Sequence, residues 1–251
     1  MGITSWRFYS GITFGVSDMK THRFIVPFEM RDEKILVISN FEILHQMVNV
    51  LHLQKNEQLI LCDGNGQEYL VHLKDIHPSE GHFWIIEKIQ HTVDRKRKVT
   101  LYASILKGEH FELLAQKATE VGVHALVPII SERTIKLNVK IERIQKIMKE
   151  SAEQSGRTIV PSVYPVISFK QSLKQSEDQE IRYFFDFHTP KFLSESIHDL
   201  SSVAAFIGPE GGWHKTERAL AEKAGCIPVS LGETTLRAET AGIIAAFLLC
   251  Q

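Results

Sequence analysis

The chain has 251 residues, of which 43% are hydrophobic and 24% are charged, and this composition excludes disorder, collagen and coiled coil as the main state. Its formal net charge of −1 argues against a strongly basic nucleic-acid binder, but residues 91–157 carry 13 basic and 8 acidic side chains, whereas 1–90 and 158–251 each carry 8 basic and 11 acidic ones. The positive middle segment predicts a local anion-binding surface, and scattered solvated charge is the simpler alternative.

The first residues and the cysteines bear on where the protein works. Residues 1–18 lack the apolar stretch of a secretory signal and are expected to be a poorly ordered leader or extension before Met19. The three cysteines are far apart and form no CxxC or Cys/His ligand pattern, so we expect a cytoplasmic protein without disulfides. None of the 12 histidines falls in an HExxH or HxxxH pair, and no metal site is expected. The longest apolar stretch, 241–250, is about half the roughly 20 residues that span a bilayer, so no membrane partner is expected.

Residues 19–92 are rich in short β-branched and aromatic runs, which are typical of strands. The turn Asp63-Gly64-Asn65-Gly66 lies between two such runs and predicts a hairpin, because these residues accept the positive φ of tight turns. One helix is expected over 41–53. Several short strands with one helix predict a small β-barrel domain over 19–92.

The pattern changes after a polar, basic connector at 91–98, which is expected to be a domain boundary. Apolar residues from Phe111 to Val121 recur on one face of a helix, and Gly122 stands where a helix-ending glycine is common. The other elements expected in this part are strands over 99–105, 125–130, 182–187, 203–208 and 227–232, and helices over 139–155, 215–224 and 239–250. Strands that alternate with helices predict an α/β domain over 93–251, with a mostly parallel sheet covered on both faces.

A glycine-rich segment, Gly208-Pro209-Glu210-Gly211-Gly212, follows one of these strands directly. Ligands of open α/β sheets bind beyond the carboxyl ends of the strands, and glycines let the backbone approach a ligand closely. A simple tight turn before the next helix explains the same residues equally well. The segment is neither a Walker loop nor a GxGxxG fingerprint, so no ATP or nicotinamide site is indicated.

Two further segments carry candidate site residues. Leu231–Ala241 ends a strand and leads to Arg237, whose permanent charge and five donors suit a phosphate or a developing anion. Glu153–Arg157 ends the basic helix, and with Arg133 and Lys136 it offers cations and amides, or simply a solvated helix end with a glycine cap. Asp186, at the end of a strand, is interpreted as a turn residue.

The segments together resemble the RsmE family of SPOUT-type RNA methyltransferases. The resemblance rests on GPEGG followed by LGETTLRAETA, on KGEHFELLAQKATEVGVHALVPIISERT, on ESAEQSGRTIVP, and on HRFIV, HQMVNVLHL and LCDGNG near the start. It covers 19–251. His52 stands where the family usually has Arg, which weakens one inferred RNA contact, and the leader has no family counterpart.

The resemblance implies a PUA-like β-barrel at the N-terminus and a C-terminal SPOUT α/β domain with a trefoil knot, in a homodimer. The implied activity is methylation of N3 of a uridine in small-subunit (16S) ribosomal RNA, free or in the 30S subunit, with S-adenosylmethionine (SAM) as methyl donor. The implied SAM contacts are Ile207, Gly208, Glu210, Gly211, Gly212, Leu231, Gly232, Leu236, Arg237 and Thr240. Arg237 is the implied catalytic residue, because it can orient the base and stabilise negative charge but is a poor proton acceptor. The implied RNA contacts are Arg23, Arg133, Lys136, Arg143, Glu153, Gln154 and Arg157.

Two alternatives stay open at this point. The first is a SPOUT methyltransferase that acts on a ribose 2′-hydroxyl or on another base. The second is a non-catalytic RNA-binding protein of ribosome assembly that kept the fold. The residues do not identify the general base.

Overall fold

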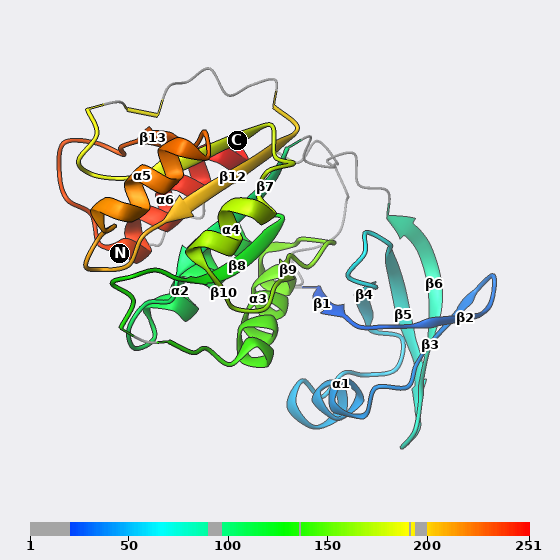
Figure 1. The fold of residues 1–251 in the computed structure, drawn as a ribbon. Helices are drawn as coiled ribbons and strands as arrows, with labels where there is room; N and C mark the ends of the chain where they lie inside the picture. The colour runs from blue at the N-terminus through cyan, green and yellow to red at the C-terminus, as the bar shows by residue number, and fades with distance from the viewer. Residues whose placement is uncertain (1–20, 90–96, 136, 191, 194–199) are drawn as a thin grey trace, which may run out of the picture.

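The computed structural model describes residues 21–89, 97–135, 137–190, 192–193 and 200–251. The expected leader at 1–18, most of the connector at 91–98, and Lys136 therefore lie outside the described residues. Two sheets, each with its own hydrophobic core, make up the N-terminal part (21–89) and the C-terminal part (97–251), which lie side by side in Figure 1. None of the described helices is long and apolar enough to cross a membrane.

The N-terminal part contains a six-stranded sheet in the order β1-β4-β5-β6-β3-β2, in which only the β1–β4 pair is parallel. Its strands are β1 (His22–Ile25), β2 (Glu29–Asp32), β3 (Ile35–Ile38), β4 (Gln58–Cys62), β5 (Glu68–Ile76) and β6 (Gly81–Ile89). The predicted hairpin joins β4 to β5, and the Asp63 carboxylate holds its turn by accepting hydrogen bonds from the backbone N–H groups of Asn65 and Gln67. Gly64 and Gly66 have the positive φ values, +80° and +106°, that the turn requires.

The sequence-based prediction was wrong in two details of this part. The single helix expected over 41–53 is α1 (Phe41–His45) followed by a π-helical turn, η1 (Gln46–Val50), and it ends before His52. Strand β2 was not predicted, because its four residues are all exposed and mostly charged and so carry no apolar alternation.

The C-terminal part is built on a parallel sheet in the order β10-β8-β7-β12-β11-β13, with β9 also paired to β8. Its strands are β7 (Lys98–Ser104), β8 (Ala125–Ile130), β9 (Ser162–Val163), β10 (Ile167–Ser168), β11 (Ile181–Phe185), β12 (Ser202–Ile207) and β13 (Ile227–Val229). Every pairing between these strands is parallel, which confirms the mixed α/β prediction for this part.

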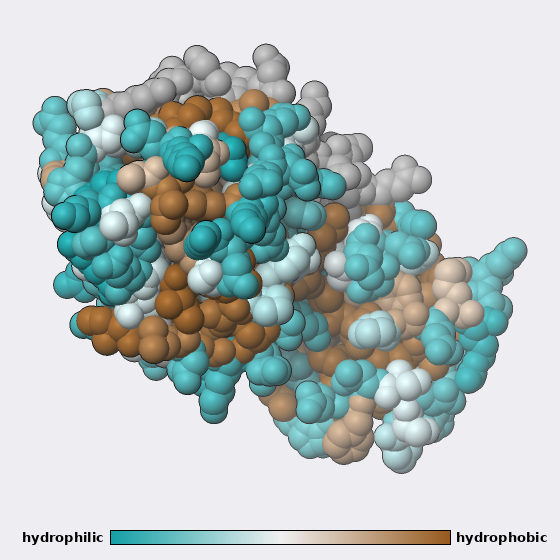
Figure 2. Space-filling view, viewed as in Figure 1, coloured by the Kyte–Doolittle hydropathy of each residue, from teal (hydrophilic) through white to brown (hydrophobic). Residues whose placement is uncertain are grey.

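Helices cover both faces of this sheet. One face packs on α2 (His110–Val121), α3 (Ile141–Ser155) and α6 (Ala238–Cys250), and the other packs on α4 (Phe169–Gln175) and α5 (Lys215–Lys223). Gly122 ends α2 with φ +111°, as predicted. The prediction missed α4, a short helix whose start is fixed by a capping box between Ser168 and Gln171. Hydrophobic side chains also reach the surface of the C-terminal part on the face seen in Figure 2.

The two parts contact each other through α3 and the β4–β5 turn. The Glu153 carboxylate, on α3, accepts a hydrogen bond of 2.7 Å from the backbone N–H of Ile25 at the end of β1. The backbone of the β4–β5 turn also forms hydrogen bonds with the segment after α3. The N–H of Val160 donates to the carbonyl of Gly64, and the N–H of Gly66 donates to the carbonyl of Thr158. This fixed contact orients the N-terminal sheet relative to the C-terminal part.

Candidate functional site

The carboxyl ends of three neighbouring strands meet at one edge of the parallel sheet. Phe185 at the end of β11 is in register with Ile207 of β12 and with Val229 of β13. The segments that follow these strands therefore start side by side, as the rule for open α/β sheets anticipates for a ligand site.

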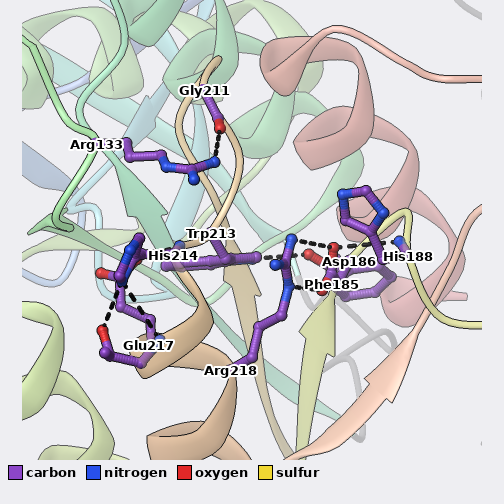
Figure 3. Close-up of polar contacts among 10 residues, drawn as sticks. Arg133, Phe185, Asp186, His188, Gly211, Trp213, His214, Glu217 and Arg218 are labelled. Carbon is purple, nitrogen blue, oxygen red and sulfur yellow. Dashed lines mark hydrogen bonds and ion pairs between the residues drawn. The ribbon is translucent and has the colours of Figure 1, made fainter.

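The GPEGG loop after β12 is a tight turn that also forms one wall of a pocket. The N–H of Gly212, at φ +66°, donates to the carbonyl of Pro209 at 2.8 Å. Trp213 is buried under the loop and stacks on Phe184 with ring centroids 4.5 Å apart. Its indole N–H donates to the carbonyl of Phe185 at 2.9 Å, as Figure 3 shows. The turn and the ligand-loop interpretations of this segment are thus compatible.

Two side chains hold the GPEGG loop from outside. Arg133 donates to the carbonyl of Gly211 at 2.8 Å, as Figure 3 shows. The Glu210 carboxylate accepts a hydrogen bond of 2.8 Å from the backbone N–H of Lys107, before α2. Both contacts restrict the conformations of the loop. Less conformational entropy is therefore lost when a ligand binds to its backbone.

A pocket of about 820 Å³ opens between these loops. All of the predicted cofactor residues line it except Thr240, which follows the lining residue Glu239 on α6. The lining residues that the sequence reasoning missed are Lys107, His110, Phe185, Asp186, Phe187, His188, Pro209, Trp213, Arg218, Val229, Ser230, Thr234, Thr235, Ala238, Glu239 and Ala241. The cofactor contacts of the ten predicted residues stay predictions.

Asp186 has a larger role than the turn residue that the sequence suggested. Its carboxylate forms an ion pair with Arg218 of α5 and accepts a hydrogen bond from the backbone N–H of His188 at 3.2 Å (Figure 3). It follows β11 at the same edge as Gly208 and Gly232. Its position directly after a strand that neighbours β12 and β13 would have identified Asp186 as a candidate site residue.

Arg237 lies at the rim of the pocket, at the start of α6. It is the N-cap residue, its backbone is extended, and its side chain is exposed. Nearby, His110 Nδ1 lies 2.8 Å from the buried carboxylate of Glu239. Burial raises the pKa of Glu239, but hydrogen bonds from its own N–H and from His110 outweigh burial, so its pKa lies below the usual value. A carboxylate that stays ionised here adds negative potential to the pocket.

Four of the predicted RNA contacts lie on or beside α3, and three of them, Arg143, Gln154 and Arg157, are described first. Arg143 is exposed and makes a two-pronged ion pair with Glu112 of α2, with both hydrogen bonds at 2.7 Å. Arg157 donates to the carbonyl of Thr119 at 2.8 Å. Gln154 lines a shallow groove between α2 and α3. These side chains are near the surface, and their contacts with RNA stay predictions.

Arg23 and Glu153 have partners inside the protein. Arg23 forms an ion pair with the fully buried carboxylate of Glu68 and donates to Cys62 Sγ at 3.3 Å. Burial, followed by the neighbouring Glu68 charge, raises the pKa of the Cys62 thiol to about 12. Glu153 joins the two parts of the chain through Ile25. Both side chains therefore make internal contacts, which the sequence pattern did not indicate.

Comparisons with known proteins bear on this site. A family model described as an RNA methyltransferase domain matches residues 94–249. Ribosomal RNA small subunit methyltransferase E of Mesomycoplasma hyopneumoniae is 32% identical over 235 residues, which are 92% of this chain and 98% of that protein. The same enzyme of Bacillus subtilis is 32% identical over 219 residues, covering 81% and 85%. The crystal structure of ribosomal RNA small subunit methyltransferase E from Neisseria gonorrhoeae bound to S-adenosyl methionine aligns with a TM-score of 0.82 at 30% identity, covering 90% of this chain and 95% of that one.

Proposed function

The chain belongs to the RNA methyltransferase family that includes ribosomal RNA small subunit methyltransferase E, and from this we propose that it methylates N3 of a uridine in 16S ribosomal RNA with SAM as methyl donor. The observation that carries the proposal is the pocket at the carboxyl edge of the parallel sheet, where the loops after β11, β12 and β13 converge. The related enzyme from Neisseria gonorrhoeae was solved bound to SAM.

The residues of the pocket fit this donor. SAM supplies an electrophilic methyl group on a positively charged sulfonium. Apolar side chains of Phe185, Ile207 and Val229 offer a surface for a flat adenine ring. The carboxylate of Glu239, whose pKa lies below its usual value, provides negative potential for a cationic ligand. The glycines of the GPEGG loop expose backbone groups that can hydrogen-bond to a ligand.

The chemistry of the proposed reaction assigns a task to Arg237. Uridine N3 carries a proton at neutral pH, and negative charge develops on the uracil as that proton leaves. A guanidinium beside the uracil stabilises this charge. Arg237 is exposed at the rim of the pocket, where an incoming base would meet it. Its high pKa makes it a poor general base, so its role is orientation and charge stabilisation.

The base must reach the pocket outside a Watson–Crick pair, because N3 lies on the pairing edge. The target uridine is therefore unpaired or flipped out of its stack. We assign the surface around α3 to the RNA backbone, through the cations Arg143 and Arg157 and the amide of Gln154. The RNA contacts predicted for Arg23, Arg133, Lys136 and Glu153 belong to the same proposal.

The finer details of the fold belong to the same proposal. We infer that residues 19–92 form a PUA-like barrel and residues 93–251 a SPOUT domain with a trefoil knot. The knot is inferred from the family to which the chain belongs, and helices on both faces of a wholly parallel sheet support the α/β part of this inference. Six mostly antiparallel strands around one core support the barrel.

We also propose a homodimer that works in the cytoplasm, where ribosomal subunits are assembled. Large hydrophobic side chains are exposed on neighbouring helices of the C-terminal part, at Leu113 of α2 and at Phe247 and Leu248 of α6. Such a surface suits a second copy of the chain.

One experiment tests the proposal against both alternatives. Purified protein is incubated with SAM and small ribosomal subunits from a strain that lacks the enzyme, and the nucleosides are identified by mass spectrometry. A 2′-O-methylated nucleoside or another methylated base would favour a different SPOUT activity. No methylation together with no SAM binding by calorimetry would favour the non-catalytic RNA-binding protein.

A further inference from the structure

A cluster of potential metal ligands lies at the β5–β6 hairpin of the N-terminal sheet, away from the SAM pocket. Asp75 of β5 is in register with His82 of β6, so their side chains lie on the same face of the sheet. His77 follows Asp75 by two residues and lies on that face as well. The N–H of His77 donates to the carbonyl of Glu80 at 2.8 Å, which closes the turn. The hairpin backbone therefore brings these three side chains together.

The distances within the cluster suit a small cation. Asp75 Oδ1 lies 2.7 Å from His82 Nδ1 and 3.3 Å from His77 Nε2, and all three ligand atoms lie within 4.8 Å of one another. Zinc takes nitrogen and oxygen ligands at roughly 2.0–2.2 Å, so two ligands of a tetrahedral site are about 3.3 Å apart. The three atoms are thus near the spacing that a shared ion requires.

The Asp75 oxygen at the centre of the cluster is a buried atom of a side chain that is 35% exposed. Its close contacts are the imidazole nitrogens of His82 and His77, and neither contact has the geometry of a hydrogen bond. A cation bound between this oxygen and the two nitrogens would give the carboxylate a well-placed electrostatic partner.

The two nitrogens of His82 have different neighbours. Its Nε2 lies 3.2 Å from Glu80 Oε1, and in the tautomer whose Nε2–H donates to this carboxylate, Nδ1 is the nitrogen that can bind a metal. Arg31 is the nearby cation, with Nη1 3.4 Å from His82 Nε2 and Nη2 3.2 Å from Glu80 Oε2. Glu80 therefore balances the charge of Arg31 next to the cluster.

We propose that Asp75, His77 and His82 bind one divalent transition-metal ion of the zinc class, with water in the remaining position. Two imidazoles favour zinc, cobalt, nickel or copper over magnesium and calcium, which prefer oxygen ligands. His77 is 59% exposed, so an ion can reach the site from solvent. Bound metal would clamp the β5–β6 hairpin and stabilise the N-terminal sheet.

Cobalt(II) is the probe for the first test, because its visible absorption reports its coordination. Untagged protein is treated with chelator and titrated with Co²⁺. We expect one equivalent to bind with an absorption band that is lost or weakened at least tenfold in His77→Ala and in Asp75→Asn. His45→Ala, which removes an exposed histidine from α1, is the matched control and should bind as the wild type does. No band in the wild type, or equal affinity in wild type and His77→Ala, would overturn the proposal.

Two further measurements guard against a misfolded variant. Circular dichroism should show the same fold for wild type and His77→Ala, because this side chain is mostly exposed. Addition of Zn²⁺ should raise the Tm of the wild type and of His45→Ala, but not that of His77→Ala. Glu80→Gln should weaken binding about tenfold without abolishing it, because Glu80 only orients His82. A Tm increase of the same size in His77→Ala would contradict the assigned ligands.

Discussion

Glu210 Oε1 accepts a hydrogen bond from the backbone N–H of Lys107 at 2.8 Å, and this contact joins the GPEGG loop to a segment 103 positions earlier in the chain. The sequence resemblance implied that Glu210 contacts the cofactor. In the structure one of its oxygens holds two walls of the pocket together, and its second oxygen is available for a ligand. The loop is thus fixed by a contact that no local motif encodes.

The Glu210 contact leads to the first prediction. Glu210→Ala should raise the Kd for SAM about fivefold, since a net hydrogen bond is worth about 1 kcal/mol. Its Tm should change little, because the side chain is exposed. Calorimetry measures the affinity, with Glu210→Gln as a variant that keeps an acceptor and Glu222→Ala, on the exposed side of α5, as control. An unchanged Kd in Glu210→Ala would show that the contact does not shape the pocket.

Gly208 allows the second prediction, because an added Cβ would lie 3.0 Å from the rigid indole of Trp213. Gly208→Ala should therefore displace the loop, with a loss of about 1–3 kcal/mol in the free energy of unfolding and much weaker SAM binding. Gly156→Ala is the matched control: its φ of +76° costs about 1 kcal/mol, but no atom lies within 4 Å of the new Cβ. Urea denaturation and calorimetry should show both variants destabilised and only Gly208→Ala impaired in binding.

Arg23 provides the third prediction, because its partner Glu68 is fully buried. Arg23→Ala leaves this carboxylate without its guanidinium and should lower the free energy of unfolding by about 3–5 kcal/mol. The double variant Arg23→Ala/Glu68→Gln should recover part of the loss, and Lys34→Ala, at an exposed position, should be neutral. If Arg23→Ala weakened RNA binding while its stability stayed that of the wild type, the structural role would be refuted.

Glu153 gives a pH dependence as the fourth prediction. Burial raises its pKa above the usual value, although the N–H of Ile25 and the charge of Lys149 oppose this effect. The folded state therefore binds the proton more tightly than the unfolded state, so the ionised carboxylate costs stability above the folded pKa. Glu153→Gln keeps an acceptor for Ile25 without the charge. The Tm of Glu153→Gln at pH 7.5 should equal or exceed that of the wild type. As the pH falls towards 4.5, the Tm of the wild type should rise relative to that of Glu153→Gln. A wild-type advantage that grows with rising pH would contradict this.

Arg237 is the subject of the fifth prediction. Arg237→Ala should lower the rate of methyl transfer about 10²–10³-fold, because it removes the cation that stabilises the developing charge. Arg237→Lys should recover part of the rate, since it restores charge without the planar fork of donors. Single-turnover assays at saturating SAM separate this effect from binding. Full activity in Arg237→Ala would remove Arg237 from the catalytic role.

Much of the C-terminal part could be predicted from the sequence, because its signals are local. The buried strand β12 is an unbroken apolar run, and α2 has a clear helical periodicity that stops at Gly122. Their order alone indicated a parallel sheet with a site at its carboxyl edge. By contrast, α4 has only seven residues, too few for periodicity to stand out, and β2 has no buried residue.

The site was only partly predictable, because several of its residues meet through the fold. Asp186 and His110 reach the pocket from different elements, and their partners, Arg218 and Glu239, are 32 and 129 positions away in sequence. Arg23 looked like a surface cation, yet strand pairing places it beside a buried acid. No spacing rule indicates contacts that depend on which strands are neighbours.

The nucleoside composition of the reaction product tests the central claim most directly. Small ribosomal subunits from a strain without the enzyme are incubated with wild-type protein and SAM, and the RNA is digested and measured by mass spectrometry. The account predicts 3-methyluridine that forms only when protein and SAM are both present. Methylation solely at a ribose or at another base, or no methylation by protein that binds SAM, would contradict it.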